Sequence, residues 1–250
     1  MNMIGRLSVL AALVVCSTAT RASTNLSPGT EGSLLETITL YPLTIGVDYD
    51  QRTRGVDMTG PLGREGEFSA DSLTAVIGIR VLPWLAPFVT VGSTETELAG
   101  FGTDDDELIW SIGVQASLWQ QDLAHPEWVA GRLSVRTVAE YVSGDLSSKP
   151  DVRGDWTELN LSLLLGYEVF VKEPHSREST PYSLQLYAGP GWSDLDGDAR
   201  ISGVGVDFDS SQEFVLVAGA DLFVADNVSV GGAVRLGSDT DWRVGLRFHF

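Results

Sequence analysis

The residues most able to do chemistry in this sequence are three alternating aspartates. Asp194, Asp196 and Asp198 stand at every second position, which is the spacing that begins an EF-hand calcium loop. Ala199 stands where that loop needs a glycine, and Gly205 where it needs a bidentate glutamate. The three aspartates are therefore candidate ligands for Ca²⁺ or Mg²⁺ with an incomplete ligand set. Solvated surface charge is the alternative, and no other cofactor is expected.

Candidate bases and nucleophiles are few. The chain has three histidines, His125, His175 and His249, and one cysteine, Cys16. A second acidic cluster runs from Asp104 to Glu107, but nothing around it supplies the apolar burial that acid–base catalysis by aspartates alone requires. Whether a histidine can reach either acidic cluster depends on the elements that carry them.

The last nine residues, Trp242 to Phe250, predict one such element. Apolar residues alternate strictly with Arg243, Gly245, Arg247 and His249, which in an extended chain gives one apolar and one polar face. A terminal aromatic residue preceded by apolar residues at every second position resembles the C-terminal assembly signal of bacterial outer-membrane β-barrels. The assembly machinery of that membrane is therefore an expected partner of this segment.

Similar alternation recurs along the chain and predicts ten strands separated by turn residues. We infer an all-β fold, a transmembrane antiparallel up-and-down β-barrel of about ten strands, with eight as the alternative because the third, ninth and tenth segments are weak or short. The predicted strands cover residues 39–50, 73–80, 89–92, 108–118, 129–141, 158–169, 182–192, 214–222, 228–236 and 242–250.

The N-terminus predicts export. Arg6 precedes an apolar run from Leu7 to Val15, and Ala22 ends a cleavage-like segment, so residues 1–22 are interpreted as a cleavable signal peptide. Residues 23–38 are interpreted as a flexible periplasmic leader, and 39–250 as the barrel domain. Lipidation of Cys16 is an alternative, although the bulky Val15 precedes it. Without Cys16 the mature chain can form no internal disulfide.

A periplasmic N-terminus places five predicted connections outside the cell and four short turns in the periplasm. The outer connections are 51–67, 94–107, 143–155, 193–213 and 237–241, and they contain 20 acidic and 6 basic residues. The tryptophans then fall near the two membrane interfaces, as in barrel girdles. Trp84, Trp119 and Trp128 lie near the periplasmic rim, and Trp110, Trp156, Trp192 and Trp242 near the outer rim.

Charged residues on the predicted inner face nearly cancel. We interpret them as ion pairs that plug a narrow lumen, because a barrel of this size leaves little more than side-chain space. A narrow channel for ions or small solutes is the alternative. The inward acidic residues are Asp48, Asp50, Glu140, Glu158, Glu168 and Asp221, and the basic ones are Arg80, Arg132, Arg136, Lys172, Arg235, Arg243 and Arg247.

The topology also argues against an enzyme. His125 and His175 fall in periplasmic turns and His249 lies beside the periplasmic terminus, so none can serve the outer acidic clusters. The formal charge of −18 excludes nucleic acid as a natural partner. Expected partners are instead outer-membrane lipid and lipopolysaccharide, and the protein is expected to act as a monomer.

The whole mature chain resembles the small outer-membrane barrels related to OmpA, OmpX and the opacity proteins, on its signal peptide, its alternating strands and its last nine residues. The resemblance implies a location in the bacterial outer membrane and a structural or surface-interaction role. It carries over no functional residue, because such barrels share an architecture more than a site motif.

Overall fold

In a computed structural model, the described residues form twelve β-strands. These residues are 42–59, 64–99, 101–102, 107–123, 131–148, 152–170, 183–201, 203–210, 214–225, 228–237 and 240–250, so the predicted signal peptide and leader lie outside them. Among the described residues, no helix is long and apolar enough to cross a membrane. The strands are β1 (Leu43–Thr59), β2 (Arg64–Ile79), β3 (Leu85–Leu98), β4 (Phe101–Gly102), β5 (Glu107–Leu123), β6 (Gly131–Ser148), β7 (Val152–Phe170), β8 (Ser183–Ile201), β9 (Val204–Ser210), β10 (Phe214–Ala225), β11 (Val228–Leu236) and β12 (Thr240–His249).

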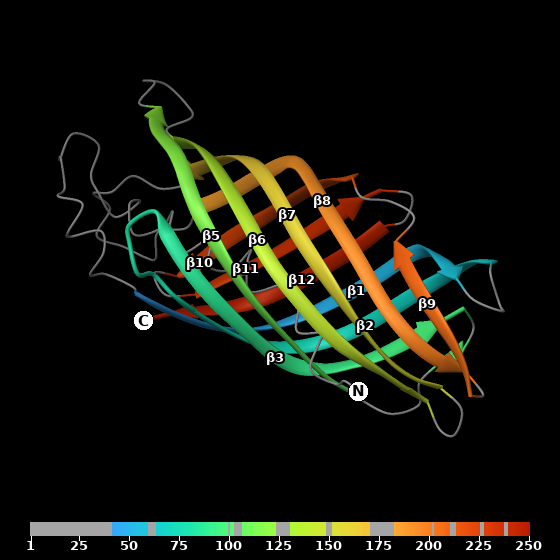
Figure 1. The fold of residues 1–250 in the computed structure, drawn as a ribbon. Coiled ribbons are helices and arrows are strands. Elements are labelled where there is room, and N and C mark those ends of the chain that lie inside the picture. Colours follow the sequence, from blue (N-terminus) through green and yellow to red (C-terminus); the bar gives the residue numbers. More distant parts are fainter. Residues whose placement is uncertain are drawn as a thin grey trace.

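Ten of these strands form a closed antiparallel barrel (Figure 1). The order is β1, β2, β3, β5, β6, β7, β8, β10, β11 and β12, and β12 pairs with β1 to close the wall. Main-chain hydrogen bonds between Leu43 and Phe250, of 2.8 and 3.0 Å, complete that seam. The ten-strand prediction is confirmed, and the eight-strand alternative is wrong.

The prediction of long loops at one end of the barrel is wrong. At the end away from Phe250, which we call the extended end, β1 continues to Thr59 and β8 to Ile201. The hairpin of β11 and β12 stops well short of that level. β9 takes its place and pairs with β8 on one side and with β1 on the other (Figure 1).

The sequence pattern hides these strand extensions because the apolar face changes sides along each strand. On β1 the apolar residues Ile45 and Val47 point outward and are about half exposed, whereas Val56 and Met58 point inward and are buried. The same inversion occurs on β7 and β8. Outward apolar residues suit a wall surrounded by lipid, and inward ones suit a wall surrounded by water. The inversion therefore marks the edge of the lipid-facing band.

Aromatic side chains follow that edge. Tyr49 and Trp242 lie 5.3 Å apart between ring centroids, and Trp110 and Tyr141 lie 6.2 Å apart, all four on outward positions. Trp156 does not belong to this girdle, contrary to the prediction, because it points into the barrel beyond the inversion and is 1% exposed. At the opposite end, Trp84 and Trp119 are exposed, and Trp128 lies outside the described residues.

The barrel seam gives a first testable prediction. Phe248 faces outward between Ile45 of β1 and Val228 of β11, so Phe248→Asp puts a charge into the lipid-facing band. Such a charge costs ~2–4 kcal/mol at mid-depth and less toward an interface. We expect a sharp fall in membrane-inserted protein, measured as the heat-modifiable band on gels. Deleting Phe250 should act similarly, because it removes the two closing hydrogen bonds.

Thr240→Asp is the matched control, since it places the same charge on an exposed outward position of β12 at the hairpin tip. Unchanged insertion of Phe248→Asp would contradict the assignment of the seam to the lipid-facing band.

Candidate functional site

Two apolar clusters fill the lumen at different depths. The outer cluster lies at the extended end, where Phe68 packs against Trp156 at 5.0 Å and against Phe208 at 6.0 Å between centroids. Gly197 leaves space for the Phe208 ring, because a Cβ there would overlap it. The outer cluster contains Val56, Met58, Phe68, Ala70, Leu98, Val142, Leu146, Trp156, Leu195, Ala199, Ile201, Val206 and Phe208. The inner cluster contains Val76, Ala86, Phe88, Val138, Leu164, Tyr187 and Val217.

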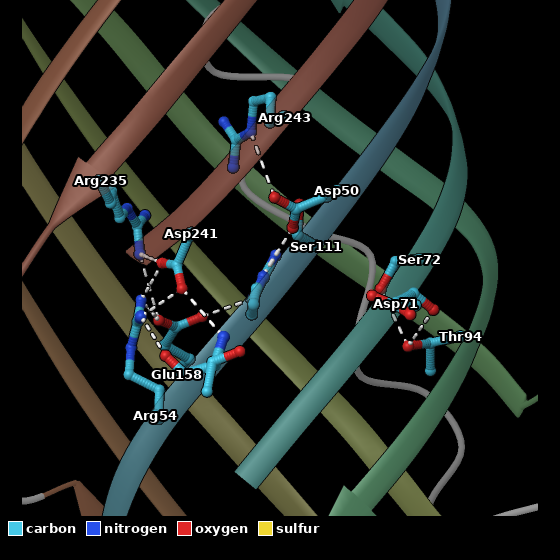
Figure 2. A network of polar contacts seen from close by, with 12 residues as sticks. Asp50, Arg54, Asp71, Ser72, Thr94, Ser111, Glu158, Arg235, Asp241 and Arg243 are labelled. Atoms are coloured by element: carbon cyan, nitrogen blue, oxygen red, sulfur yellow. Dashed lines mark hydrogen bonds and ion pairs between the residues drawn. The ribbon is translucent and has the colours of Figure 1, made fainter. Parts of the chain in front are cut away.

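An ionic layer separates the two clusters, since Glu158 of β7 stands between Trp156 of the outer cluster and Leu164 of the inner cluster. Figure 2 shows the polar contacts of this layer. Glu158 of β7 is its centre. Its carboxylate lies 2.5 Å from the Arg52 guanidinium, 3.3 Å from Arg235 and 3.5 Å from Arg54, and it accepts a hydrogen bond of 2.7 Å from Ser193. The layer consists of Asp50, Arg52, Arg54, Glu158, Arg235, Asp241 and Arg243.

Asp241 ties the hairpin of β11 and β12 to β1. Its carboxylate pairs with Arg54 at 2.5 Å and accepts a hydrogen bond of 3.1 Å from the Thr53 main-chain N–H. Thr53 lies where β1 has left β12 and not yet met β9, so the side chain replaces a strand partner. Asp50 forms ion pairs with Arg52 of its own strand at 2.6 Å and with Arg243 of β12 at 3.5 Å.

The ionic layer bridges opposite walls of the barrel. β1 and β7 are separated by the same number of strands in both directions around the wall, so the contact between Arg52 and Glu158 crosses the lumen. Glu158, Asp50, Arg235 and Arg243 were predicted inward and are found there. Arg52, Arg54 and Asp241 were missed, because they were assigned to outer loops. Arg52 and Arg54 stand at every second position between the inward Asp50 and the apolar Val56, and this spacing is the sequence signal that could have placed them inward.

A polar layer fills the barrel beyond the inner cluster, toward Phe250. Asp48 pairs with Arg247 there, and Arg136 lies 5.9 Å from the Tyr187 ring centroid. The remaining predicted inward charges, Arg80, Arg132, Glu140, Glu168 and Asp221, are also buried, whereas Lys172 lies outside the described residues.

His249 sits in that layer between two hydroxyl groups. Its Nε2 lies 3.0 Å from Ser229 Oγ and its Nδ1 3.4 Å from Thr44 Oγ1, and both Ser229 and His249 are 2% exposed. The Ser–His spacing suits a nucleophile and base, but the burial leaves no approach for a substrate. His125 and His175 lie outside the described residues.

Asp194, Asp196 and Asp198 lie on β8, and not in a loop as predicted. They point outward at the extended end, where Asp196 and Asp198 are exposed and Asp194 is half-buried. Alternate residues on one face of a strand are about 6.6 Å apart, too far for three carboxylates to meet at one Ca²⁺ at 2.3–2.6 Å. Among the described residues there is no group of three or more His, Cys, Asp or Glu able to hold a metal ion.

Neighbouring strands instead supply further aspartates opposite them. Asp196 is paired with Asp209, and Asp198 with both Asp155 and Asp207, while Asp209 also faces Asp57 of β1. Five of these carboxylates line a surface hollow of about 410 Å³, and Asp57 is the strand neighbour of one of them, Asp209. We call this set the acidic face: Asp57, Asp155, Asp196, Asp198, Asp207 and Asp209. The cluster Asp104 to Asp106 lies outside the described residues.

Like charges opposed across strands destabilise a sheet. The acidic face relieves part of this repulsion by sharing a proton. The pKa of Asp198 is raised above its usual value because its protonated carboxyl group donates a hydrogen bond to Asp155, and partial burial and the negative charge of Asp155 act in the same direction. Asp198 lies outside the lipid-facing band, on the wall segment whose apolar side points inward.

Comparisons with known proteins do not identify a family for this chain. No protein-family model and no curated protein matches the sequence. The transport unit of the autotransporter AIDA-I from Escherichia coli is 9% identical, covers 96% of this chain and 98% of its own, and has a TM-score of 0.43. The outer membrane protease OmpT from Escherichia coli is 12% identical, with coverages of 84% and 95% and a TM-score of 0.38. The translocator domain of NalP from Neisseria meningitidis is 12% identical, with coverages of 97% and 100% and a TM-score of 0.32.

The strand pairing itself defines the class of protein. A closed ten-stranded antiparallel wall with an outward apolar band, an aromatic edge and charged side chains buried in its lumen is the architecture of an outer-membrane β-barrel. The resemblance to the OmpA, OmpX and opacity-protein group stays a prediction, since no family model matches.

Proposed function

We propose that this protein is a bacterial outer-membrane barrel with a sealed lumen, which acts at the cell surface in a structural or surface-interaction role. The extended end faces the exterior, and the acidic face is its contact surface. We assign the protein no catalytic activity. We expect lipopolysaccharide and the outer-membrane assembly machinery to be its partners.

The contact between Arg52 and Glu158 across the lumen is the observation that carries this proposal. It stands between two clusters of mainly apolar side chains, which offer ions little polar surface along which to move. A conducting path would need a continuous hydrated gap past the ionic layer and both apolar clusters. The balance of acidic and basic groups in the ionic layer suits internal pairing better than selectivity for one sign of charge.

Conductance in a planar bilayer tests the proposal against the alternative, a narrow channel for ions or small solutes. We expect the purified protein to give no steady ohmic current in 1 M KCl, because the ionic layer and the two clusters block the lumen. The current through the unmodified protein is compared with that through the double variant Arg52→Ala/Glu158→Ala, in which the contact that blocks the lumen is removed. Steady unitary current from the unmodified protein would overturn the sealed-lumen proposal in favour of the channel.

We expect divalent cations to bind at the acidic face, each bridging two carboxylates on paired strands, because no group of three described carboxylates can hold one ion. We do not expect Asp194, Asp196 and Asp198 to chelate a cation by themselves. We expect millimolar Ca²⁺ or Mg²⁺ to stabilise the folded barrel on the order of 1 kcal/mol, by mass action on the folded state. Asp196→Asn/Asp198→Asn should reduce the shift in thermal midpoint. Glu97→Gln, an exposed carboxylate on β3 away from the acidic face, should not.

The effect of pH gives a further check on the acidic face. Because the pKa of Asp198 is raised in the folded chain, the folded state binds a proton more readily than the unfolded state. The stability of the unmodified barrel should therefore rise, relative to Asp198→Asn, as the pH falls through that pKa, and the cation effect should shrink. If neither Ca²⁺ nor these substitutions changed the thermal midpoint, the acidic face would be only solvated.

A further inference from the structure

A cavity of about 40 Å³ lies in the lumen between the ionic layer and the inner cluster. Val138, Leu164 and Val217 of the inner cluster form one side, and Asp50, Arg52 and Arg243 of the ionic layer form the other. The β11 and β12 hairpin contributes Arg235 and Asp241. A water molecule needs about 10–15 Å³ of such volume and two to four polar partners, so the cavity has room for about three.

Two buried polar side chains, Glu140 and Asn160, line this cavity, and each has at least one polar atom with no hydrogen-bond partner in the protein. Glu140 of β6 is 2% exposed, and its Oε1 accepts a hydrogen bond of 2.6 Å from Ser111, while its Oε2 has no partner. Asn160 of β7, the strand neighbour of Glu140, is 6% exposed, and neither atom of its amide is hydrogen-bonded. Nη2 of Arg52 is likewise without a hydrogen-bond partner.

The chemistry of these atoms defines the ligand. Glu140 Oε2 needs a donor, Arg52 Nη2 needs an acceptor, and the Asn160 amide needs one of each whichever way it is turned. The lining carries three carboxylates, Asp50, Glu140 and Asp241, and three guanidinium groups, Arg52, Arg235 and Arg243, so it favours neither sign of charge. The ligand is therefore neutral, small, and both a donor and an acceptor.

We propose that this cavity is a binding site for a cluster of two or three water molecules that joins Glu140 and Asn160 to the ionic layer. The cluster gives Glu140 a second partner, since no ion pair of this carboxylate with a described residue is found and its nearest hydrogen-bond donor is Ser111. It also connects β6 and β7 to the hairpin of β11 and β12, which has no direct strand pairing with either. Burying a polar atom without a partner is destabilising, and the water cluster supplies partners to four such atoms: Glu140 Oε2, Arg52 Nη2 and both polar atoms of the Asn160 amide.

A crystal structure of the purified protein at a resolution that shows ordered water is the direct test. We expect density in the cavity at hydrogen-bond distance from Glu140 Oε2 and from Asn160, with peaks that do not change when NaCl is replaced by KCl or choline chloride. A direct contact between Glu140 and Arg243 that closes the cavity would overturn the proposal. Density or a thermal midpoint that depends on the choice of cation would also overturn it, by showing an ion in place of water.

Thermal midpoints of substituted proteins give an independent test. Asn160→Leu should lower the midpoint by several degrees, because it displaces the cluster and leaves Glu140 Oε2 without a donor. Adding Glu140→Leu should recover part of that loss, whereas Glu140→Gln alone should cost little, because an amide can keep both Ser111 and water as partners. Strictly additive losses for the two leucine substitutions would contradict a shared water cluster.

Discussion

Glu158→Ala is expected to lower the free energy of unfolding by about 3–5 kcal/mol, because removal of one member of a buried ion-pair network leaves the remaining charges unpaired. Arg52, Arg54 and Arg235 all contact this one carboxylate, and Arg52 and Glu158 are each no more than 3% exposed in their side chains. Urea unfolding from lipid vesicles, followed by tryptophan fluorescence, measures the loss.

Two companion variants separate charge from packing. Glu158→Gln keeps the shape and the hydrogen bond from Ser193 but removes the charge, so its loss should be intermediate. Glu97→Ala removes an exposed carboxylate from β3 and should change the unfolding free energy little. A Glu158→Ala protein as stable as the unmodified one would show that the arginines find other partners, and that this carboxylate does not hold the layer together.

Trp156→Ala should be the most damaging substitution in the outer cluster. The side chain is the largest of those buried below 2% exposure, and it packs edge-on against Phe68 at 5.0 Å. Truncation of a buried tryptophan typically costs about 3–5 kcal/mol, through lost burial and the cavity that remains. We expect a loss of that size in the same urea experiment, with the lipid-facing wall still assembled.

Trp242→Ala is the control for this prediction. Trp242 points outward at the edge of the lipid-facing band, is 38% exposed and packs on Tyr49 at 5.3 Å, so its truncation removes contact area without opening a cavity. If Trp242→Ala destabilised the barrel more than Trp156→Ala, the outer cluster would not be the packed core described above.

Much of this protein follows from the local pattern of its sequence. The ten strands of the barrel wall, the outward face of the described lipid-exposed segments and most inward charges were predicted correctly, because period-two alternation is written directly in consecutive residues. Asp50, Glu158, Arg235 and Arg243 were all placed in the lumen by that pattern alone. Glu140 was too, although the cavity that it shares with Asn160 has no sequence signature.

Only the tertiary structure shows that the segments beyond the lipid-facing band are strand extensions and not loops. The alternation of β1 shifts by one residue between Tyr49 and Val56, and that shift resembles a loop when it is read as sequence. The surroundings of the wall change from lipid to water at this level, so the apolar side must change from outward to inward. Trp156 was misplaced for this reason, as were the three aspartates of β8.

The sequence by itself thus determined a ten-stranded barrel with charges in its lumen and an acidic exterior. Which charges meet was decided only by closure of the wall, since Arg52 and Glu158 are 106 residues apart and become neighbours because their strands lie opposite each other. The acidic face arose in the same way, because β9 brings Asp207 and Asp209 beside Asp198 and Asp196. Alternation specifies the face on which a side chain lies, but strand order and register specify its partner, and both depend on contacts between distant segments.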